Sequence, residues 1–243
     1  MNSIIFTGGK FPSKEKTKHF LTSLEDKQKI VIVADSGLDA AMSYNIKPDY
    51  FLGDMDSVSL KSIEWLKTNN CIGSTEIFPT DKDFSDTEIA LKKAAKLGIK
   101  YVTVIGGSGG RLDHLLGIVE LFKCEYAPNL WLTEENAVCL IDSKKSPHLS
   151  ILNSSPKDPI SVFPIFRLCH DKNLNDKNCN IYRCKSKGLV WQLDNLDWQN
   201  GEFSLSNRQN DSVNKENPVE IYAENGKFIV VAPLSAYISY KKL

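Results

Sequence analysis

The 243-residue sequence lacks an excess of charge of either sign, because 30 lysines and arginines balance 30 aspartates and glutamates. Balanced charge gives no electrostatic reason to bind nucleic acid or an anionic membrane surface, so we expect neither as a partner. The sequence also lacks any apolar run near the roughly 18 residues that a membrane-spanning helix needs. A hydrophobic fraction of 42% can still fill a core, which argues against a disordered chain.

Cysteine pairs of the C-x-x-C type are absent, although the chain has six cysteines. Cys169, His170, Cys179 and Cys184 also lack the paired ligand spacing of a common zinc site. The N-terminus lacks the three-part pattern of a signal peptide and enters an apolar segment at residues 3–7. Scattered cysteines without such a leader are typical of a reducing compartment, and we expect a cytoplasmic protein.

Up to about residue 143, short apolar runs alternate with segments of helical spacing, such as residues 87–97 and 112–122. This repeated alternation predicts an α/β domain with a mostly parallel sheet. Ser85 and Glu88 form a capping box that marks a helix start, and Gly98 can end that helix in the left-handed conformation. The predicted strands are residues 4–6, 30–34, 50–52, 76–78, 101–105 and 130–132.

After residue 143 the helical spacing fades and short alternating segments predict antiparallel strands in an all-β, sandwich-like domain. The polar segment 143–159 is predicted to contain the boundary, and the polar segment 167–180 to be a long hairpin loop. We therefore predict two domains, residues 1–143 and 144–243. The predicted strands of the second domain are residues 160–166, 188–193, 203–205, 219–222 and 227–232.

Asp54 and Asp56 follow the predicted strand at residues 50–52 and are separated by one residue. In extended backbone their side chains point to the same side, so both can supply oxygen to one hard divalent cation such as Mg²⁺. The same residue types also suit a solvated turn. Their place at the end of a predicted parallel strand favours the metal site, because ligands of open α/β sheets bind there.

A second acidic cluster, Asp81, Lys82, Asp83 and Asp86, lies at the next predicted strand-to-helix junction. Part of it has a structural explanation, because carboxylates in a first helical turn oppose the helix dipole favourably. Four charged residues within six positions exceed what a helix cap requires. Carboxylates this close raise one another's pKa unless Lys82 or a cation compensates, and bound Mg²⁺ is the functional interpretation.

A glycine-rich segment, residues 106–110, precedes Arg111 and the helix predicted from residue 112. It is neither a P-loop nor a dinucleotide fingerprint, because the required lysine and glycine spacings are missing. Glycines let the backbone approach an anion, a helix N-terminus points its amides at one, and an arginine can bind two oxygens at once. Together with the carboxylates, these parts predict a nucleotide phosphoryl-transfer enzyme. Asp113 alone is equally well explained as a surface acid that the helix dipole favours.

Three blocks in the first domain resemble the thiamine pyrophosphokinase family over about residues 30–140. Ser36 and Ser85 stand where the family more often has glycine and threonine. Residues 188–191 and 204–207 are fainter matches that look like the family's thiamine-binding half. The three blocks are residues 34–37 with 48–49 and 53–57, residues 82–88, and residues 109–114.

The resemblance implies a homodimer with active sites at the subunit interface, in which Mg²⁺ is the cofactor and ATP and thiamine are the substrates. The pyrophosphoryl group of ATP would move to the hydroxyl of thiamine, releasing AMP. The residues implied for catalysis are Asp54, Asp56, Asp86 and Arg111. The implied metal ligands are Asp54, Asp56, Asp83 and Asp86. The residues implied for ATP and its phosphates are Asp35, Lys82, Gly109, Gly110, Arg111 and Asp113.

For thiamine, the resemblance implies that Trp191 stacks on the aminopyrimidine ring, with Ser206 and Asn207 offering hydrogen bonds. A structural role is the alternative for Trp191, because it shares one predicted strand face with Leu189 and Leu193. Two other functions stay open. A metal-dependent nucleotide-sugar glycosyltransferase also uses two aspartates after a strand, although it leaves the second and third blocks unexplained. A non-catalytic nucleotide sensor of the same fold would bind ATP without turnover.

Overall fold

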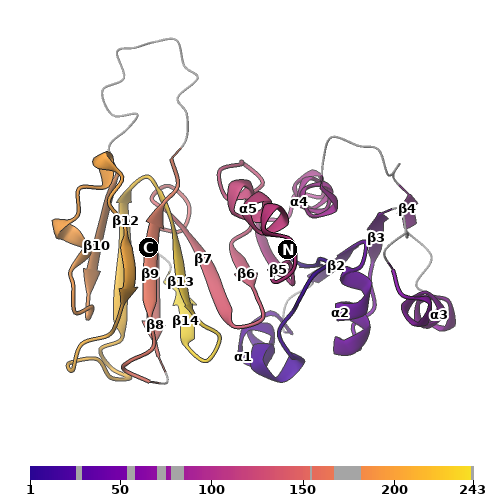
Figure 1. The fold of residues 1–243 in the computed structure, drawn as a ribbon, viewed down its shortest axis with the longest axis horizontal. Helices are drawn as coiled ribbons and strands as arrows, with labels where there is room; N and C mark the ends of the chain where they lie inside the picture. Colours follow the sequence, from indigo (N-terminus) through magenta and orange to yellow (C-terminus); the bar gives the residue numbers. More distant parts are fainter. Residues whose placement is uncertain are drawn as a thin grey trace, which may run out of the picture. The chain divides into compact units, whose positions relative to one another are not determined.

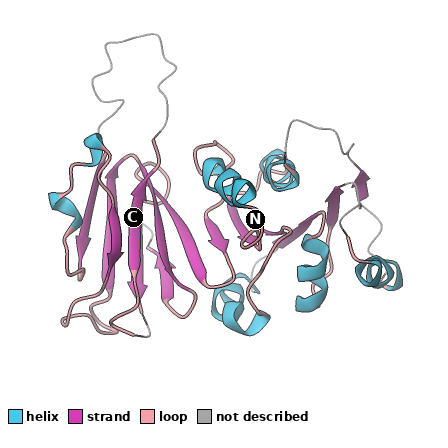
Figure 2. Ribbon diagram, viewed as in Figure 1, coloured by secondary structure: helices cyan, strands magenta, loops and turns pink. Residues whose placement is uncertain are grey.

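The computed structural model describes two compact units, Met1–Glu135 and Asn136–Leu243 (Figure 1). The first unit alternates strands with helices, whereas the second consists of strands with two short 3₁₀ helices among its described residues (Figure 2). No helix within the described part of the chain is long and apolar enough to cross a membrane. The described residues are 1–25, 29–53, 58–69, 75–77, 85–153, 155–166 and 182–241.

The strands of the first unit form a parallel sheet in the order β6-β5-β1-β2-β3-β4. Ile4, Ile5 and Phe6 of β1 are fully buried, as expected for a central strand with helices over both faces of its sheet. Figure 1 shows α4 and α5 over one face and α1 and α2 over the other. The strands are β1 (Asn2–Phe6), β2 (Lys29–Ala34), β3 (Tyr50–Gly53), β4 (Thr75–Ile77), β5 (Tyr101–Ile105) and β6 (Leu130–Leu132). The helices are α1 (Lys14–Glu25), α2 (Gly37–Tyr44), α3 (Leu60–Thr68), α4 (Asp86–Lys96) and α5 (Leu112–Leu121).

The order of the strands reverses between β1 and β5. From β1 the chain adds β2, β3 and β4 toward one edge, and then β5 and β6 on the other side of β1. In open α/β sheets, ligands bind beyond the carboxyl ends of the strands at such a reversal. The segments that follow β1 and β5 therefore occupy the position where a ligand is expected.

Helix α4 begins and ends as the sequence predicts. The Ser85 hydroxyl accepts the backbone N–H of Glu88 at 3.2 Å, which caps the first turn. The Glu88 carboxylate accepts a hydrogen bond from the Tyr126 hydroxyl at 2.8 Å and lies 2.9 Å from the Lys92 ammonium. At the other end Gly98 has a φ of +70°, the left-handed conformation that often closes a helix and costs least at glycine.

The second unit contains two antiparallel sheets, ordered β11-β9-β13-β7 and β10-β12-β8-β14, which confirms the predicted sandwich-like class. Leu149, Ile151, Ile221, Phe228 and Val230 are fully buried on these strands and contribute to its core. The strands are β7 (Asn136–Asp142), β8 (His148–Leu152), β9 (Ile160–Pro164), β10 (Arg183–Lys187), β11 (Ser204–Asn207), β12 (Val219–Asn225), β13 (Lys227–Pro233) and β14 (Tyr237–Tyr240). The 3₁₀ helices are η1 (Leu193–Asn195) and η2 (Trp198–Asn200).

One predicted strand of the second unit is wrong. Residues 188–193 are not a strand; the strand here is β10, and it ends before Gly188, whose φ is +81°. A Cβ at Gly188 would stand 3.2 Å from the Cα of Val219, so this close approach also requires glycine. Strands β7, β8 and β14 were not predicted, and β8 lies within residues 143–159, the polar segment predicted to contain the domain boundary.

Candidate active site

Asp35 lies directly after β2, at the carboxyl edge of the parallel sheet. Its backbone N–H donates to the Leu52 carbonyl in β3 at 2.8 Å. Its φ of 47° is left-handed, a conformation that aspartate adopts more readily than most residues. Gly53, the last residue of β3, lies against it, because a Cβ on Gly53 would stand 3.0 Å from the Asp35 Cα. Gly53, the residue before the predicted acidic pair, therefore lies at this edge.

Asp86 is the first residue of α4 and is half-buried. The next residue, Thr87, shares a hydrogen bond of 2.5 Å between its hydroxyl and that of Thr7, the residue that follows β1. Both threonines are buried. This bond fixes the first turn of α4 to the carboxyl end of β1. Asp86 and Asp35 are thereby both placed at the carboxyl edge of the sheet.

Four residues of the predicted site, Asp54, Asp56, Lys82 and Asp83, lie outside the described residues. Within the described ranges, no three histidine, cysteine, aspartate or glutamate side chains are grouped as a metal site would require. Asp35 and Asp86 nevertheless supply carboxylate groups at the carboxyl edge of the sheet. Carboxylate oxygen is the ligand type that Mg²⁺ prefers, so the chemistry of these donors fits the predicted cofactor.

The glycine-rich loop after β5 packs against the loop after β1. A Cβ on Gly106 would stand 2.3 Å from the carbonyl oxygen of Thr7, so these two segments of the backbone approach too closely for any side chain there. The Gly107 N–H donates to the Gly8 carbonyl at 2.7 Å. Gly109 and Gly110 follow with φ of +70° and +73°. The loop is held by main-chain contacts at the point where the strand order reverses.

Arg111 and Asp113 form a two-bond pair directly after this loop. The Arg111 Nε and Nη2 atoms donate to the two Asp113 carboxylate oxygens at 3.1 and 2.5 Å. Their hydrogen bond, together with the attraction of the opposite charges, raises the pKa of Arg111 and lowers that of Asp113. Both side chains are exposed, at 72% and 61%, so solvent screens the pair and it contributes little to stability. Its effect is to orient the guanidinium.

Trp191 is 55% exposed, whereas its predicted strand companions Leu189 and Leu193 are fully buried. The alternation that would have placed Trp191 in the core therefore does not hold. The fully buried Asn207 binds the Trp191 backbone at both groups: its Nδ2 donates to the carbonyl at 2.7 Å, and its Oδ1 accepts the N–H at 3.2 Å. The Arg208 guanidinium carbon lies 5.0 Å from the centre of the indole ring, a cation–π contact.

Ser206 is exposed and has a φ of 53°, at the point where the pairing of β11 with β9 is irregular. Its backbone N–H donates to the Ser161 hydroxyl at 3.0 Å. The structure thus brings together the three residues expected to bind thiamine. Asn207 differs from Trp191 and Ser206 in that its side chain is buried and bonded to the protein.

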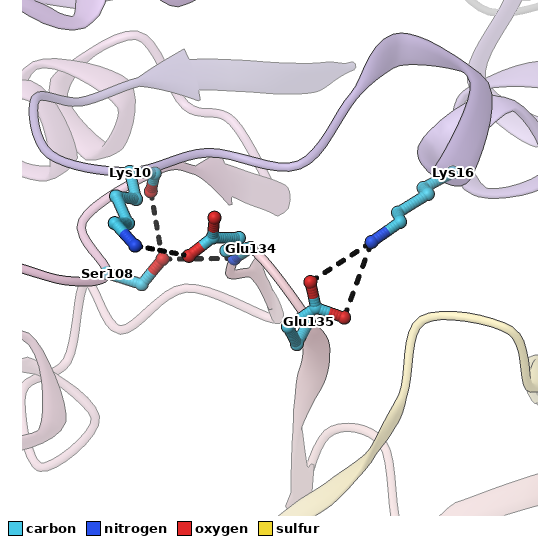
Figure 3. Close-up of polar contacts among 5 residues, drawn as sticks. All are labelled: Lys10, Lys16, Ser108, Glu134 and Glu135. Carbon is cyan, nitrogen blue, oxygen red and sulfur yellow. Dashed lines mark hydrogen bonds and ion pairs between the residues drawn. The ribbon is translucent and has the colours of Figure 1, made fainter.

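Sequence reasoning missed the segment after β1. Lys10 pairs through its main chain with Ser108 of the glycine-rich loop, and its ammonium lies 3.2 Å from Glu134, as Figure 3 shows. Two glycines shortly after the first predicted strand, Gly8 and Gly9, could have indicated this segment. Glycines at that position permit the close approach that the glycine-rich loop makes.

The sequence of the first unit matches a known family. Residues 21–131 match the family model described as the catalytic domain of thiamin pyrophosphokinase. Thiamine pyrophosphokinase of Bacillus subtilis (strain 168) is 28% identical over 101 residues, which is 42% of this chain. The first unit is thus similar in sequence to the catalytic domain of the thiamin pyrophosphokinases. The alignment spans 46% of the Bacillus protein, about half its length.

Solved structures of thiamine pyrophosphokinases share the fold over both units. The crystal structure of the Bacillus subtilis protein has a TM-score of 0.68 at 18% identity, covering 96% of this chain and 99% of that one. Thiamin pyrophosphokinase from Candida albicans has a TM-score of 0.62 at 15% identity, covering 96% of this chain and 89% of that one. These likenesses confirm the predicted fold class, and the relatives carry the name of a transferase.

Proposed function

We propose that this protein transfers the pyrophosphoryl group of ATP to the hydroxyl of thiamine, giving thiamine diphosphate and AMP. The observation that supports it most is the shared carboxyl edge of the sheet. There Asp35, Asp86 and the glycine-rich loop come together at the reversal of strand order. Each belongs to one of the three sequence blocks through which the chain resembles its relatives.

In this reaction the alcohol oxygen of thiamine forms a bond to the β-phosphorus of ATP. The bond from that phosphorus to the oxygen it shares with the α-phosphate breaks, AMP leaves with the electron pair, and the proton of the thiamine hydroxyl is released to solvent. Negative charge grows on the phosphate oxygens during the transfer, so the protein's task is to position the two substrates and to stabilise charge.

Mg²⁺ would be held by Asp54, Asp56 and Asp86, joined by Asp83, and would neutralise charge on the phosphate oxygens when bound. The backbone of Gly109 and Gly110 and the Arg111 guanidinium would bind the phosphates, because both offer N–H donors to anionic oxygen. Asp113 would keep the guanidinium oriented until the nucleotide arrives. We include Asp35 and Lys82 among the residues that contact ATP.

On the substrate side, Trp191 would stack on the aminopyrimidine ring, since an exposed indole held by its backbone offers a preorganised aromatic face. Ser206 would contribute a hydrogen bond, and Asn207 would contribute by fixing the position of Trp191. We further propose a cytoplasmic homodimer whose sites lie at the subunit interface. Neither nucleic acid nor a membrane is proposed as a partner.

Incubation with ATP, Mg²⁺ and thiamine tests the proposal, with AMP and thiamine diphosphate measured by chromatography. Release of both in equal amounts, dependent on thiamine, is the expected result. ATP binding without any AMP would contradict the proposal and identify a nucleotide sensor. Failure to bind ATP, combined with metal-dependent hydrolysis of a nucleotide sugar, would identify a glycosyltransferase.

A further inference from the structure

We propose that Lys10 is a second cationic ligand for the polyphosphate of the nucleotide, acting beside the glycine-rich loop together with Arg111. Glu134 is its resting partner when no anion is bound. The inference deepens the proposed function and rests on it, because it requires that this edge of the sheet bind a nucleoside triphosphate.

The main chain of Lys10 is fixed to the glycine-rich loop. Its N–H donates to the Ser108 carbonyl at 2.6 Å, and the Ser108 N–H donates back to the Lys10 carbonyl at 3.3 Å. The Ser108 hydroxyl donates to the same carbonyl at 2.9 Å. These bonds join the segments that follow β1 and β5. Lys10 therefore lies at the reversal of strand order, where open α/β sheets bind their ligands.

The side chain of Lys10 runs along Gly109. A Cβ on Gly109 would stand 2.6 Å from the Lys10 Cδ and 2.8 Å from its Cγ, so the lysine stem occupies the space that a larger residue would fill. The loop that offers its amides to phosphate is thus in direct contact with a lysine. One cation lies against Gly109, and a second, Arg111, follows Gly110.

Lys10 can exchange Glu134 for another anionic partner at little cost in free energy. The two charged groups are 3.2 Å apart, and their side chains are 63% and 45% exposed. Exposed pairs of this kind contribute little to stability, because solvent screens them. A polyphosphate carries several negative charges and can replace one carboxylate as the partner. The Ser108 hydroxyl also accepts the Glu134 N–H at 3.0 Å, so one residue holds both members of the pair near the loop (Figure 3).

Lys16 provides a matched control in the same region. Its ammonium lies 3.1 and 3.3 Å from the two carboxylate oxygens of Glu135, and the side chains are 50% and 68% exposed. Figure 3 shows Lys16 reaching this carboxylate from helix α1, apart from Ser108 and Lys10. The two ion pairs are alike in exposure, and their glutamates are neighbours in the sequence. Of the two lysines, Lys10 packs on the glycine-rich loop.

The test is isothermal calorimetry with ATP and with inorganic tripolyphosphate, on the wild type and on Lys10→Met, Lys10→Arg and Lys16→Met. We expect Lys10→Met to bind both ligands about tenfold more weakly, since one ionic contact to phosphate is lost. Lys10→Arg should recover most of the affinity, and Lys16→Met should stay within twofold of the wild type. In turnover, Lys10→Met should raise KM for ATP more than it lowers kcat. Melting temperatures near that of the wild type will show that the variants are folded.

The outcomes separate this inference from the proposed function. Suppose that the wild type makes thiamine diphosphate and that Lys10→Met binds ATP as tightly as the wild type. The role of Lys10 is then overturned, and the proposed function stands. If binding depends on Lys10 but thiamine is not pyrophosphorylated, the polyphosphate site stands and the proposed reaction is overturned. A wild type that binds neither ligand overturns both. Equal losses of affinity in Lys10→Met and Lys16→Met would also overturn the assignment, because they would reflect the net charge of the protein and not a specific contact.

Discussion

At the scale of single residues, the site depends on side chains that are oriented by near neighbours. Asp113, two residues after Arg111, holds the guanidinium with two hydrogen bonds. Asn207 of β11 fixes the backbone of Trp191. Such partners can be guessed from sequence only when they are close in the chain. Arg111 and Asp113 are two residues apart, so their pairing is local, whereas the buried bonds of Asn207 depend on tertiary folding.

Replacing Arg111 by lysine should lower kcat/KM for ATP by about tenfold or more, because lysine keeps the charge but loses the planar pair of donors. Steady-state kinetics at saturating thiamine measures this effect. Lys123→Arg serves as the control, since Lys123 pairs with Glu120 on the exposed side of α5. Nearly full efficiency in Arg111→Lys would mean that Arg111 is only a local charge.

Asp54→Ala and Asp56→Ala should each reduce kcat by roughly 10³-fold or more, because each removes an anionic oxygen proposed to bind Mg²⁺. Asp211→Ala, at an exposed position of the second unit, is the matched control and should retain full activity. Circular dichroism and melting curves will show whether the variants fold. Activity within a few-fold of the wild type in either site variant would contradict the metal assignment.

At the scale of helices and strands, the α/β half follows closely from the sequence. Each of its predicted strands corresponds to a strand of the structure within a residue or two, because buried parallel strands are short apolar runs bounded by polar residues. The all-β half is less predictable. Residues 188–193 alternate like a strand, yet Gly188 turns the chain away after β10. The strand β8 lies in a segment whose prolines and polar residues resemble a linker.

Two glycines of the first unit should respond oppositely to alanine, although at both positions an added Cβ would have no steric clash with the surrounding residues. Gly117 lies inside α5, where alanine favours the helix by up to about 1 kcal/mol. Gly98 has a φ of +70°, where alanine costs roughly 1–2 kcal/mol. Urea denaturation should therefore show Gly117→Ala more stable than the wild type and Gly98→Ala less stable. Equal changes in both variants would show that backbone conformation does not decide the effect.

At the scale of the whole molecule, the proposed site draws on both units. The residues proposed to bind phosphate lie in Met1–Glu135, and the residues proposed for thiamine lie in Asn136–Leu243. A homodimer with sites at the subunit interface would combine the first unit of one chain with the second unit of another. Closed twofold assembly makes this combination possible.

Mixing inactive Asp54→Ala chains with inactive Trp191→Ala chains should restore activity if each site is shared between subunits. A mixed dimer then contains one site without a lesion, so with free exchange up to about a quarter of the wild-type activity per site is expected. The control is each variant mixed with itself, which should stay inactive. A mixture that exchanges subunits but remains inactive would show that each site is built from a single chain.

The central position of β1 also affects how the chain folds as it is made. Ile4 pairs with Val31 on one side and with Thr103 on the other. At a synthesis rate of about 5–20 residues per second, the second partner follows Ile4 by roughly 5–20 seconds. During that interval β1, whose Ile4, Ile5 and Phe6 are fully buried in the final fold, has one edge without its final neighbour. An open apolar edge invites pairing with other chains. Conditions that slow translation between residues 31 and 105 should therefore lower the soluble yield of this protein before they affect its activity.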